Sequence, residues 1–451
     1  MPDKALLLDL YELTMAEAYF SYKPATMATF DLFVRQLPVN RMYLVACGLE
    51  DILSYIKNLK FNREDLRYLK SRKIFSSAFL AYLAKFRFCG DIWAMPEGTI
   101  FFPQEPVIRV TAPIIEAQII ESFLLNTINL QSMIASKAAR VISAAGGREV
   151  FDFSLRRTHG ADAGLKVARA SYIAGFSGTA TVEAGKLYGI PVVGTMAHSF
   201  VMSFKRELDS FLAYSRIFPE RTVLLVDTYD VKKGISNSIA AGLYLKEKGY
   251  RLAGIRLDSG DIVFWSRLAR KMLDAAGLEY VKIFASGNLD EFKISGLLRK
   301  GAKVDSFGVG TNMGTSIDAP CLDVIYKISE VSDDSGNFFP TMKLSRGKVT
   351  YPGRKQVFRI RDKLGRYVKD ILALEKENIS GEPLLKKVAA GGRIIYKNPP
   401  LDKIRKKVRE ELARFSAALS AVYPKYRYPL FISRGLEVTR LALAKQLSKR
   451  Q

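Results

Sequence analysis

The sequence predicts an α/β protein in which an irregular (β/α) TIM-like barrel accompanies an α+β domain built from N- and C-terminal segments. Two observations predict the barrel. Apolar, β-branched runs recur in the middle third of the chain at intervals of roughly 25–35 residues, the length of one β-α unit in a parallel sheet. Most of these runs end in acidic residues, Gly or Ser, and the residues just past each barrel strand form the reactive mouth of that fold.

The strands of the barrel are predicted from six runs: EVFDF (149–153), IPVVG (190–194), TVLLV (222–226), LAGIRL (252–257), VKIFA (281–285) and VDSFGVG (304–310). GFSGT (175–179) and DVIYKI (323–328) are weaker candidates, and they would bring the number of units to seven or eight. Between the strands, residues 232–248 and 261–277 have the amphipathic spacing of helices. A Rossmann fold would need GxGxxG after its first strand, and GVGTNMG (308–314) has neither that spacing nor that place.

The remaining elements are predicted on either side of a barrel domain over residues 141–335. The N-terminal α+β segment, 1–140, has a helical start, a strand-like run over 25–38, a helix over 47–59 and a long helical run over 114–143. The C-terminal segment, 336–451, follows a turn at SDDSGN (332–337) and contains short strands within 340–396 and helices over 402–420 and 435–450. We expect the two terminal segments to pack together as one composite domain.

Composition excludes several classes of protein. At 451 residues, 48% of them hydrophobic and 25% charged, the chain is an ordinary globular protein of more than one domain. Cys47, Cys89 and Cys321 form no CxxC pair, which argues against a disulfide framework or a cysteine-rich zinc site and favours a reducing cytoplasm. The sequence has no signal-peptide pattern and no uncharged apolar stretch of the ~18 residues that a spanning helix needs, so we predict a cytoplasmic protein without a membrane partner.

The net charge of +24 is the unusual bulk property. Residues 393–450 carry 15 Lys and Arg against four acids. Clustered cations suit a nucleic-acid partner, but the helical spacing here, without interleaved aromatics, is typical of a solvated helix face. A basic surface also steers anionic substrates toward an enzyme. Nucleic acid is therefore not predicted as the partner, and a non-catalytic basic nucleic-acid-binding protein remains the alternative from another class.

The sequence contains only two histidines, His159 and His198. Each follows a different predicted strand, so both reach the mouth of the predicted barrel. His198 lies in GTMAHSF, where a functional role is favoured over a buried structural one, whereas His159 in RRTHGAD suits either role equally.

Several blocks resemble the nicotinate phosphoribosyltransferase family, in the order in which that family has them. They are LLLDLYELTMAEAY at the start, REVFDFSLRRTHGADAGL to GIPVVGTMAHSFV (148–201), LLVDTYDV (224–231), GIRLDSGDI (254–262), ASGNLDEFKI (285–294), DSFGVGTN (305–312) and KLSRGKVTYPGRKQVFR (343–359). The ordered set covers most of residues 5–395. The resemblance implies transfer of a phosphoribosyl group from phosphoribosyl diphosphate to nicotinate, which forms nicotinate mononucleotide for NAD salvage.

The resemblance also implies how the pyridine ring is bound. Phe153 and Tyr11 would sandwich the ring, with Tyr11 supplied by a second subunit, so a homodimer with shared active sites is expected. From the residues alone, Phe153 suits core packing and Tyr11 suits a helix face. Arg156 and Arg256 offer forked donors for a carboxylate or phosphate, and Arg157 is an equally good candidate.

One position bears on the choice between nicotinate and nicotinamide. The sister family that uses nicotinamide has an acid two residues after the Gly of the matching strand end, where it binds the amide. Here the stretch is Gly178-Thr179-Ala180. The neutral Ala180 removes repulsion against a carboxylate and favours nicotinate, and Thr179 is predicted to bind the substrate.

The remaining site residues suit phosphates and Mg²⁺. Backbone N–H groups of a Gly-rich loop after a late barrel strand cradle anions, so the predicted phosphate binders are Ser286, Gly287, Gly308, Gly310 and Thr311. Four Asp at strand ends offer hard oxygen ligands or helix caps, and we expect two of them to act directly. Asp227 and Asp258 are the predicted catalytic carboxylates, Asp258 and Asp261 the predicted Mg²⁺ ligands, and Asp230 the fourth candidate.

The family couples the transfer to hydrolysis of ATP through a phosphohistidine, and the matching residue is His198. A neutral imidazole attacks a γ-phosphate near neutral pH, and we expect a neighbouring carboxylate to orient its other nitrogen. The family usually has Gly where this chain has Ser154, and RRAQGPD where it has RRTHGAD.

Two related activities are alternatives to nicotinate phosphoribosyl transfer. A quinolinate phosphoribosyltransferase is generally much shorter and needs more basic residues for two carboxylates. A nicotinamide phosphoribosyltransferase is the closer alternative, and Ala180 argues against it.

Overall fold

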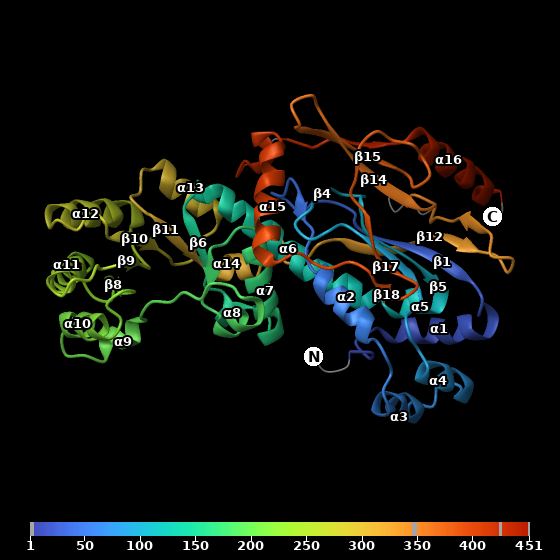
Figure 1. Cartoon of the computed structure of the whole chain (residues 1–451), viewed down its shortest axis with the longest axis horizontal. Helices are drawn as coiled ribbons and strands as arrows, with labels where there is room; N and C mark the ends of the chain where they lie inside the picture. Colours follow the sequence, from blue (N-terminus) through green and yellow to red (C-terminus); the bar gives the residue numbers. More distant parts are fainter. Residues whose placement is uncertain (1–3, 345–349, 424–425, 450–451) are drawn as a thin grey trace. The chain divides into compact units, whose positions relative to one another are not determined.

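The computed structural model describes residues 4–344, 350–423 and 426–449, which fold as two compact units (Figure 1). Unit 1 comprises residues 4–133, 321–344, 350–419 and 426–449, and unit 2 comprises Ile134–Pro320 with Ser420–Tyr423. The division falls after residues 133 and 320, whereas the sequence predicts domain limits at 140 and 335. Part of the block 343–359, namely residues 345–349, lies outside the described residues.

Unit 2 alternates strands and helices. After α6 (Glu121–Ala145), in which the unit begins, its elements are β6 (Glu149–Asp152), η1 (Leu155–Arg157), α7 (Ala161–Ile173), β7 (Gly178–Thr179), α8 (Val182–Tyr188), α9 (His198–Met202), α10 (Glu207–Ile217), β8 (Val223–Leu225), α11 (Val231–Glu247), β9 (Gly254–Leu257), α12 (Ile262–Ala275), β10 (Lys282–Ala285), α13 (Glu291–Arg299), β11 (Ser306–Val309) and α14 (Thr311–Gly314).

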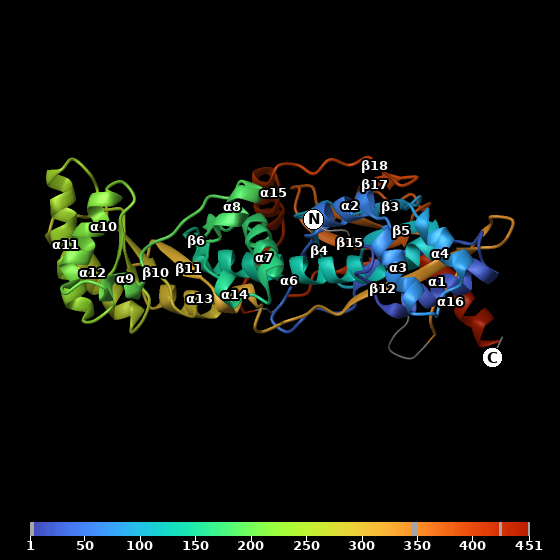
Figure 2. The same ribbon diagram turned by 90° about the horizontal axis from the view of Figure 1, so that it is seen from below.

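The strands of unit 2 form one six-stranded sheet in the order β7-β6-β11-β10-β9-β8, and every pairing is parallel. Helices α10 and α11 pack side by side, as do α11 and α12, and α12 also packs on β9 and β10 (Figures 1 and 2). Leu224, Ile255, Ile283 and Phe307 on successive strands are fully buried. Such continuous apolar strands are typical of a parallel sheet that is covered on both faces.

Two strand predictions for the barrel are wrong. Residues 190–194 form no named strand, because only Val192 makes an isolated bridge to Thr179. Residues 323–328 fall in β12 (Val324–Ser332), which pairs antiparallel with β1 (Met27–Val34) in unit 1. The described residues of unit 2 therefore contain a mixed α/β fold whose parallel sheet has six strands instead of seven or eight.

The local packing of α11 explains a glycine within that helix. A Cβ atom on Gly234 would lie 2.0 Å from the carbonyl oxygen of Val226, just after β8. Only glycine lets the first turns of α11 approach the end of the strand this closely.

Unit 1 mixes elements from both ends of the chain. Besides β1, β12 and the start of α6, they are α1 (Leu10–Tyr22), β2 (Leu44–Val45), α2 (Leu49–Asn58), α3 (Arg63–Ser71), α4 (Ser77–Ala84), β3 (Asp91–Ala94), β4 (Ile100–Phe101), β5 (Pro106–Pro113), α5 (Ile114–Ile119), β13 (Phe338–Pro340), β14 (Lys355–Arg361), β15 (Tyr367–Leu374), β16 (Glu382–Pro383), β17 (Lys386–Ala390), β18 (Arg393–Ile394), α15 (Leu401–Arg414), η2 (Ala417–Ser420, at its boundary), β19 (Leu430–Ile432) and α16 (Arg434–Ser448).

The main sheet of unit 1 has seven strands in the order β13-β12-β1-β5-β3-β17-β18, and adjacent strands are antiparallel. A second sheet has the order β16-β14-β15-β19, and β2 pairs with β4. The N-terminal strands β1, β3 and β5 thus share one sheet with strands that come more than 190 residues later in the chain. Helix α5 packs on β1 and β5, and α1 packs on α5.

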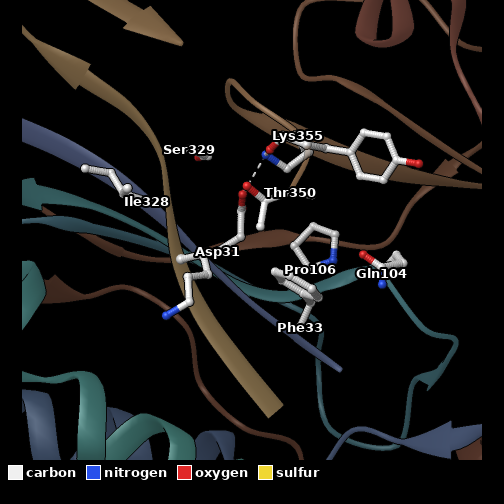
Figure 3. A pocket seen from close by; sticks show the side chains of 10 residues that line it. Asp31, Phe33, Gln104, Pro106, Ile328, Ser329, Thr350 and Lys355 are labelled. Atoms are coloured by element: carbon white, nitrogen blue, oxygen red, sulfur yellow. Dashed lines mark hydrogen bonds and ion pairs between the residues drawn. The ribbon is translucent and has the colours of Figure 1, made fainter. Parts of the chain in front are cut away.

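A buried ion pair joins the two larger sheets of unit 1. Lys355 Nζ on β14 lies 2.7 Å from Asp31 Oδ2 on β1 (Figure 3). The ammonium also donates to the carbonyl oxygens of Tyr351 and Gly353. Burial lowers the pKa of Lys355, and the charge of Asp31 opposes that shift. The other Asp31 oxygen, Oδ1, has no hydrogen-bond partner. Asp31, Ser329 and Thr350 are among the residues that line a cavity of about 10 Å³.

None of the helices within the described ranges is both long enough and apolar enough to cross a membrane.

Candidate active site

Polar residues of unit 2 gather where the parallel strands end. Because the carboxyl ends of parallel strands lie along one edge of a sheet, side chains just past them meet there. The predicted residues at this edge are Phe153, Thr179, Asp227, Arg256, Asp258, Ser286, Gly308 and Gly310. Hydrogen bonds join several of these residues.

Arg256 is the centre of this hydrogen-bond network. Its Nε donates to Ser286 Oγ, its Nη1 to Thr195 Oγ1 and its Nη2 to Asp258 Oδ1, each at 2.9 Å. The side chain is 15% exposed. Since a guanidinium is planar and forked, three such bonds fix both its position and its plane.

The Asp258 carboxylate is held in its charged form. Partial burial alone would raise the pKa of Asp258, but hydrogen bonds from Ser286 and Arg256, together with the charges of Arg256 and His198, outweigh it and lower the pKa. Ser286 Oγ donates to the same Oδ1 that accepts from Arg256. The site therefore presents an anionic carboxylate at neutral pH.

Asp227 is 8% exposed and lies beside Asp258. Its Oδ2 accepts from the backbone N–H of Asp258 at 2.9 Å and from Ser259 Oγ at 2.7 Å. Its Oδ1 is buried without a hydrogen-bond partner. An unsatisfied buried carboxylate oxygen is costly and calls for a ligand, such as a cation or a hydroxyl group.

This pair of carboxylates fits Mg²⁺, which is usually held by one or two carboxylates together with substrate phosphates. Within the described part of the chain, no group of three or more His, Cys, Asp or Glu side chains is arranged to hold a metal ion by itself. A cation at Asp227 and Asp258 would accordingly depend on the phosphates of a substrate for its remaining ligands.

The other two aspartates cap helices. Asp230 Oδ1 accepts from the backbone N–H of Lys233 at the start of α11, and Asp261 Oδ1 accepts from that of Phe264 at the start of α12. Both are N-caps, because each helix begins with the following residue. The contacts of Asp261 therefore support a structural role, whereas the sequence predicts a metal ligand.

His198 is the first residue of α9, and its side chain is 41% exposed. Its Nδ1 lies 3.1 Å from Thr228 Oγ1, and its Nε2 lies 3.9 Å from Asp258 Oδ2. The expected orienting carboxylate is thus replaced by a threonine hydroxyl, which the turn after β8 brings nearer than Asp258. His159 is exposed in the segment before α7.

Phe153 follows β6, and its ring packs against other site residues. It stacks on Phe284 with centroids 5.6 Å apart, and the Arg256 guanidinium lies 5.7 Å from its centroid. A Cβ atom on Gly308 would approach the Phe153 ring to 2.7 Å. Gly308, predicted as a phosphate binder, therefore makes room for this ring.

The other predicted phosphate binders have different local roles. Both the N–H and the hydroxyl group of Ser286 have protein partners, Leu257 O and Asp258 Oδ1. Gly287 has φ +93°, and a Cβ there would lie 1.9 Å from Asp258 O, so only glycine fits this turn. Gly310 and Thr311 form the start of α14.

Three predicted residues stand apart from the network. Thr179 ends β7, buried, with its hydroxyl bonded to Asp152. Arg156 and the alternative Arg157 are both exposed on η1. Tyr11 lies on α1 of unit 1 and is 44% exposed, so its place at an active site stays a prediction.

Sequence reasoning missed Asp152, Thr195, Thr228 and Ser259. Three of them adjoin predicted residues: Asp152 precedes Phe153, Thr228 follows Asp227 and Ser259 follows Asp258. Their position beside predicted strand-end residues could therefore have indicated that they belong to the site. Thr195 carried a similar signal, since it follows Gly194 at the end of the predicted strand 190–194, but only folding brings it to Arg256.

Comparisons with known proteins identify the family of the chain. The nicotinate phosphoribosyltransferase N-terminal domain model matches residues 6–129, and the nicotinate phosphoribosyltransferase family model matches residues 149–338. The chain is 47% identical to nicotinate phosphoribosyltransferase pncB2 of Mycobacterium tuberculosis over 95% of this chain and 91% of that protein. It is 37% identical to nicotinate phosphoribosyltransferase of Bacillus subtilis over 95% and 93%.

Solved structures show the same similarity. Human nicotinic acid phosphoribosyltransferase superposes with a TM-score of 0.86 at 28% identity, covering 97% of this chain and 99% of that one. Nicotinate-nucleotide pyrophosphorylase from Pyrococcus furiosus gives a TM-score of 0.73 at 28% identity, covering 91% and 95%. The chain belongs to the nicotinate phosphoribosyltransferase family.

Proposed function

We propose that this chain is a nicotinate phosphoribosyltransferase of NAD salvage. It joins nicotinate to the ribose of phosphoribosyl diphosphate, and nicotinate mononucleotide and diphosphate leave. The observation that carries the proposal is the 47% identity, over 95% of the chain, to a protein named for this activity. The contacts of Arg256, Asp227, Asp258 and Phe153 at one sheet edge support it, because that set suits an aromatic acid and a phosphorylated sugar.

Nicotinate binds through its ring and its carboxylate. Phe153 offers one face for stacking, and Tyr11 of a second subunit covers the other face. The guanidinium of Arg256, already fixed beside Phe153, supplies positive charge for the anionic substrates. Ala180, without charge, leaves the carboxylate of nicotinate unopposed.

The ribose develops positive charge as the diphosphate departs. Asp258, whose pKa is lowered, stabilises that charge electrostatically without having to lose a proton first. Asp227 and Asp258 would hold Mg²⁺ when it is bound, and the ion would supply positive charge that neutralises the diphosphate. The chain itself mainly orients the ring nitrogen toward the sugar carbon, and such positioning supplies much of the rate in a two-substrate reaction.

ATP hydrolysis drives the reaction through His198. A neutral nitrogen of the half-exposed imidazole attacks the γ-phosphorus of ATP, the bond from that phosphorus to the bridging oxygen breaks and ADP leaves; water later hydrolyses the phosphohistidine to inorganic phosphate. Thr228 and Asp258 lie at the two nitrogens of the ring. His198, Asp227 and Asp258 are the catalytic residues of this proposal.

The parallel sheet closes into an irregular TIM-like barrel. Val192 bridges to the edge strand β7. Farther along the same segment, Thr195 bonds to Arg256 on β9 and His198 bonds to Thr228 after β8. The segment thus has partners near both edges of the sheet, as closure requires.

The protein works as a cytoplasmic homodimer. None of Cys47, Cys89 and Cys321 forms a disulfide, which suits a reducing compartment. Exposed apolar side chains, such as Leu7 before α1 and Leu10 beside Tyr11 on α1, suit a surface covered by a second copy. The +24 charge attracts the anionic substrates.

The test is an assay of diphosphate release from phosphoribosyl diphosphate and Mg²⁺, with nicotinate, nicotinamide or quinolinate, each with and without ATP. We expect nicotinate to be used at least about tenfold better than nicotinamide, a difference of about 1.4 kcal/mol in transition-state binding. Equal use of the two would contradict the role of Ala180. A thermal-shift screen that includes single-stranded RNA tests the other class, since preferential stabilisation by RNA would favour a binding protein.

A further inference from the structure

A fully buried carboxylate lies at the end of β6 and has no part in the chemistry above. Asp152 is 1% exposed and directly precedes Phe153. Its Oδ1 accepts from the backbone N–H of Ser154 at 2.9 Å and from Ser154 Oγ at 2.5 Å, and its Oδ2 accepts from Thr179 Oγ1 at 2.7 Å. Burying a carboxylate is costly unless its oxygens are hydrogen-bonded, so the site retains this group only with these bonds in place.

The two hydroxyl groups have no proton left for a ligand. A hydroxyl carries one hydrogen, and both Ser154 and Thr179 donate theirs to Asp152. Thr179 Oγ1 also accepts from the backbone N–H of Thr181 at 3.0 Å. Thr179 therefore does not donate to nicotinate directly while the Asp152 bond holds, although the sequence predicts a substrate contact for it.

Asp152 instead holds together two loops that line the proposed nicotinate site. One loop, after β6, carries Phe153, and the other, after β7, carries Ala180. The backbone adds a bond between them, because Ala180 N–H donates to the carbonyl oxygen of Asp152 at 2.8 Å. Side-chain and main-chain oxygens of one residue thus fix both loops on neighbouring parallel strands.

Packing prevents the first loop from adjusting freely. A Cβ on Gly314 would lie 2.3 Å from Ser154 Cβ, and Phe153 N–H donates to Val309 O at 2.9 Å. The loop after β6 is therefore pressed against α14 and β11 on one side and tied to Thr179 on the other. Rotation of Ser154 away from Asp152 would require movement of these neighbours.

We infer that Asp152 is a positioning residue for nicotinate recognition, which acts through Ser154 and Thr179 by fixing the separation of Phe153 and Ala180. The inference rests on the proposed function, because it takes Phe153 and Ala180 as the residues that face the pyridine and its substituent. It also reassigns Thr179 from a substrate contact to a support of the loop that carries Ala180.

The test is Asp152→Asn, which keeps the shape but turns one acceptor oxygen into an N–H₂ donor that faces a hydroxyl donor. We expect KM for nicotinate to rise about tenfold or more, with kcat and KM for phosphoribosyl diphosphate changed less than about threefold. The ratio of kcat/KM for nicotinate to kcat/KM for nicotinamide should fall as well. Asp305→Asn is the matched control, since Asp305 also accepts a backbone N–H, that of Ile283, but at the amino end of the sheet.

Two further variants separate support from direct contact. Thr179→Ser keeps the hydroxyl and retains the wild-type KM for nicotinate, whereas Thr179→Val raises that KM as Asp152→Asn does. Both changes break the hydrogen bond between Asp152 and Thr179. KM for nicotinate in the double variant Asp152→Asn/Thr179→Val should therefore exceed the higher of the two single-variant KM values by no more than about twofold. Additive losses would assign Thr179 a contact of its own and overturn the inference.

The remaining outcomes are equally decisive. If Asp152→Asn lowers kcat and the melting temperature and raises both KM values together, Asp152 is merely structural and the inference is wrong. If Asp152→Asn does not fold, Thr179→Val and Thr179→Ser still decide, because equal KM for nicotinate in the two variants contradicts the inference. Wild-type protein that uses nicotinamide or quinolinate instead of nicotinate refutes the proposed function itself, a result visible before any variant is made.

Discussion

The pKa values of two carboxylates of this chain are shifted in opposite directions by their surroundings. Asp258 is surrounded by Arg256, Ser286 and His198, and its pKa is lowered despite partial burial. Glu12 on α1 is fully buried beside other acids, and its pKa is raised from 4.5 to about 7. Asp258 is therefore ionised at neutral pH, and Glu12 makes the stability of the fold depend on pH.

The role of His198 is decided by labelling. With γ-labelled ATP, the wild-type protein should acquire an acid-labile, base-stable label, because a phosphoramidate hydrolyses in acid. His198→Ala abolishes the label and His159→Ala, the matched control, retains it. His198→Asn should keep the fold and lose stimulation by ATP. A label that persists in His198→Asn, or full stimulation of that variant by ATP, would refute the phosphohistidine.

Glu12 predicts how the stability of unit 1 varies with pH. Burial is the largest cause of its raised pKa, and the charges of Glu121 and Asp9 add to it, while hydrogen bonds from Ser122 oppose it. A carboxyl with a raised folded pKa stabilises the fold fully below pH ~4.5, and that stabilisation is lost as pH rises through about 7. Since one pKa unit corresponds to about 1.4 kcal/mol, the lost contribution is on the order of 3 kcal/mol.

Glu12→Gln mimics the protonated carboxyl and should remove this dependence. The difference in urea midpoint between variant and wild type should grow from pH 5 to pH 8, in favour of the variant. Glu50→Gln, an exposed residue at the start of α2, is the control. A difference that stays constant with pH would show that Glu12 does not titrate in this range.

At the scale of elements, the residues of the proposed site lie at the ends of strands, and a buried ion pair between two sheets stabilises unit 1. The carboxyl ends of β6, β8, β9 and β10 supply Asp152, Asp227, Asp258 and Ser286, so one geometric property of parallel strands brings together residues far apart in sequence. In unit 1, the Asp31–Lys355 pair joins β1 and β14, and both side chains are buried.

Removing one partner of the Asp31–Lys355 pair should be severe. Lys355→Met leaves the buried Asp31 carboxylate without its cation, which costs about 3–5 kcal/mol. Urea unfolding should show this loss, whereas Lys363→Met, at an exposed position, should change stability by less than about 0.5 kcal/mol. Adding Asp31→Asn to Lys355→Met should recover part of the loss. A cost below about 1 kcal/mol would mean that water already solvates this pair.

At the scale of the whole molecule, Tyr11 and the proposed catalytic carboxylates Asp227 and Asp258 belong to different compact units. Unit 2 contains the network around Arg256, and unit 1 contains the antiparallel sheet with α1. If Tyr11 completes the site of a second copy, neither unit suffices for catalysis, and the active species is at least a dimer, for which twofold symmetry is the default.

Mixed subunits test this arrangement. Tyr11→Ala and His198→Ala proteins should each be nearly inactive, and after subunit exchange their mixture should recover about a quarter of wild-type activity, since half of the dimers are mixed and each holds one intact site. A mixture of His198→Ala with His198→Asn, which shares no intact site, is the control. No recovery after verified exchange would mean that each site comes from one chain.

The sequence by itself determined the family, five of the six strands predicted most strongly for unit 2 (all but 190–194) and the helices α11 and α12. Local signals sufficed there, because apolar runs, capping aspartates and ordered family blocks are all read along the chain. Tertiary structure alone decided that residues 323–328 pair with β1, since an isolated apolar run suits a parallel or an antiparallel partner equally. It also decided that Asp152 supports Thr179 and that a threonine hydroxyl meets His198. These are contacts across 27 and 30 residues of chain, and side-chain hydrogen bonds at such separations depend on how strands are ordered in the sheet, which periodicity does not encode.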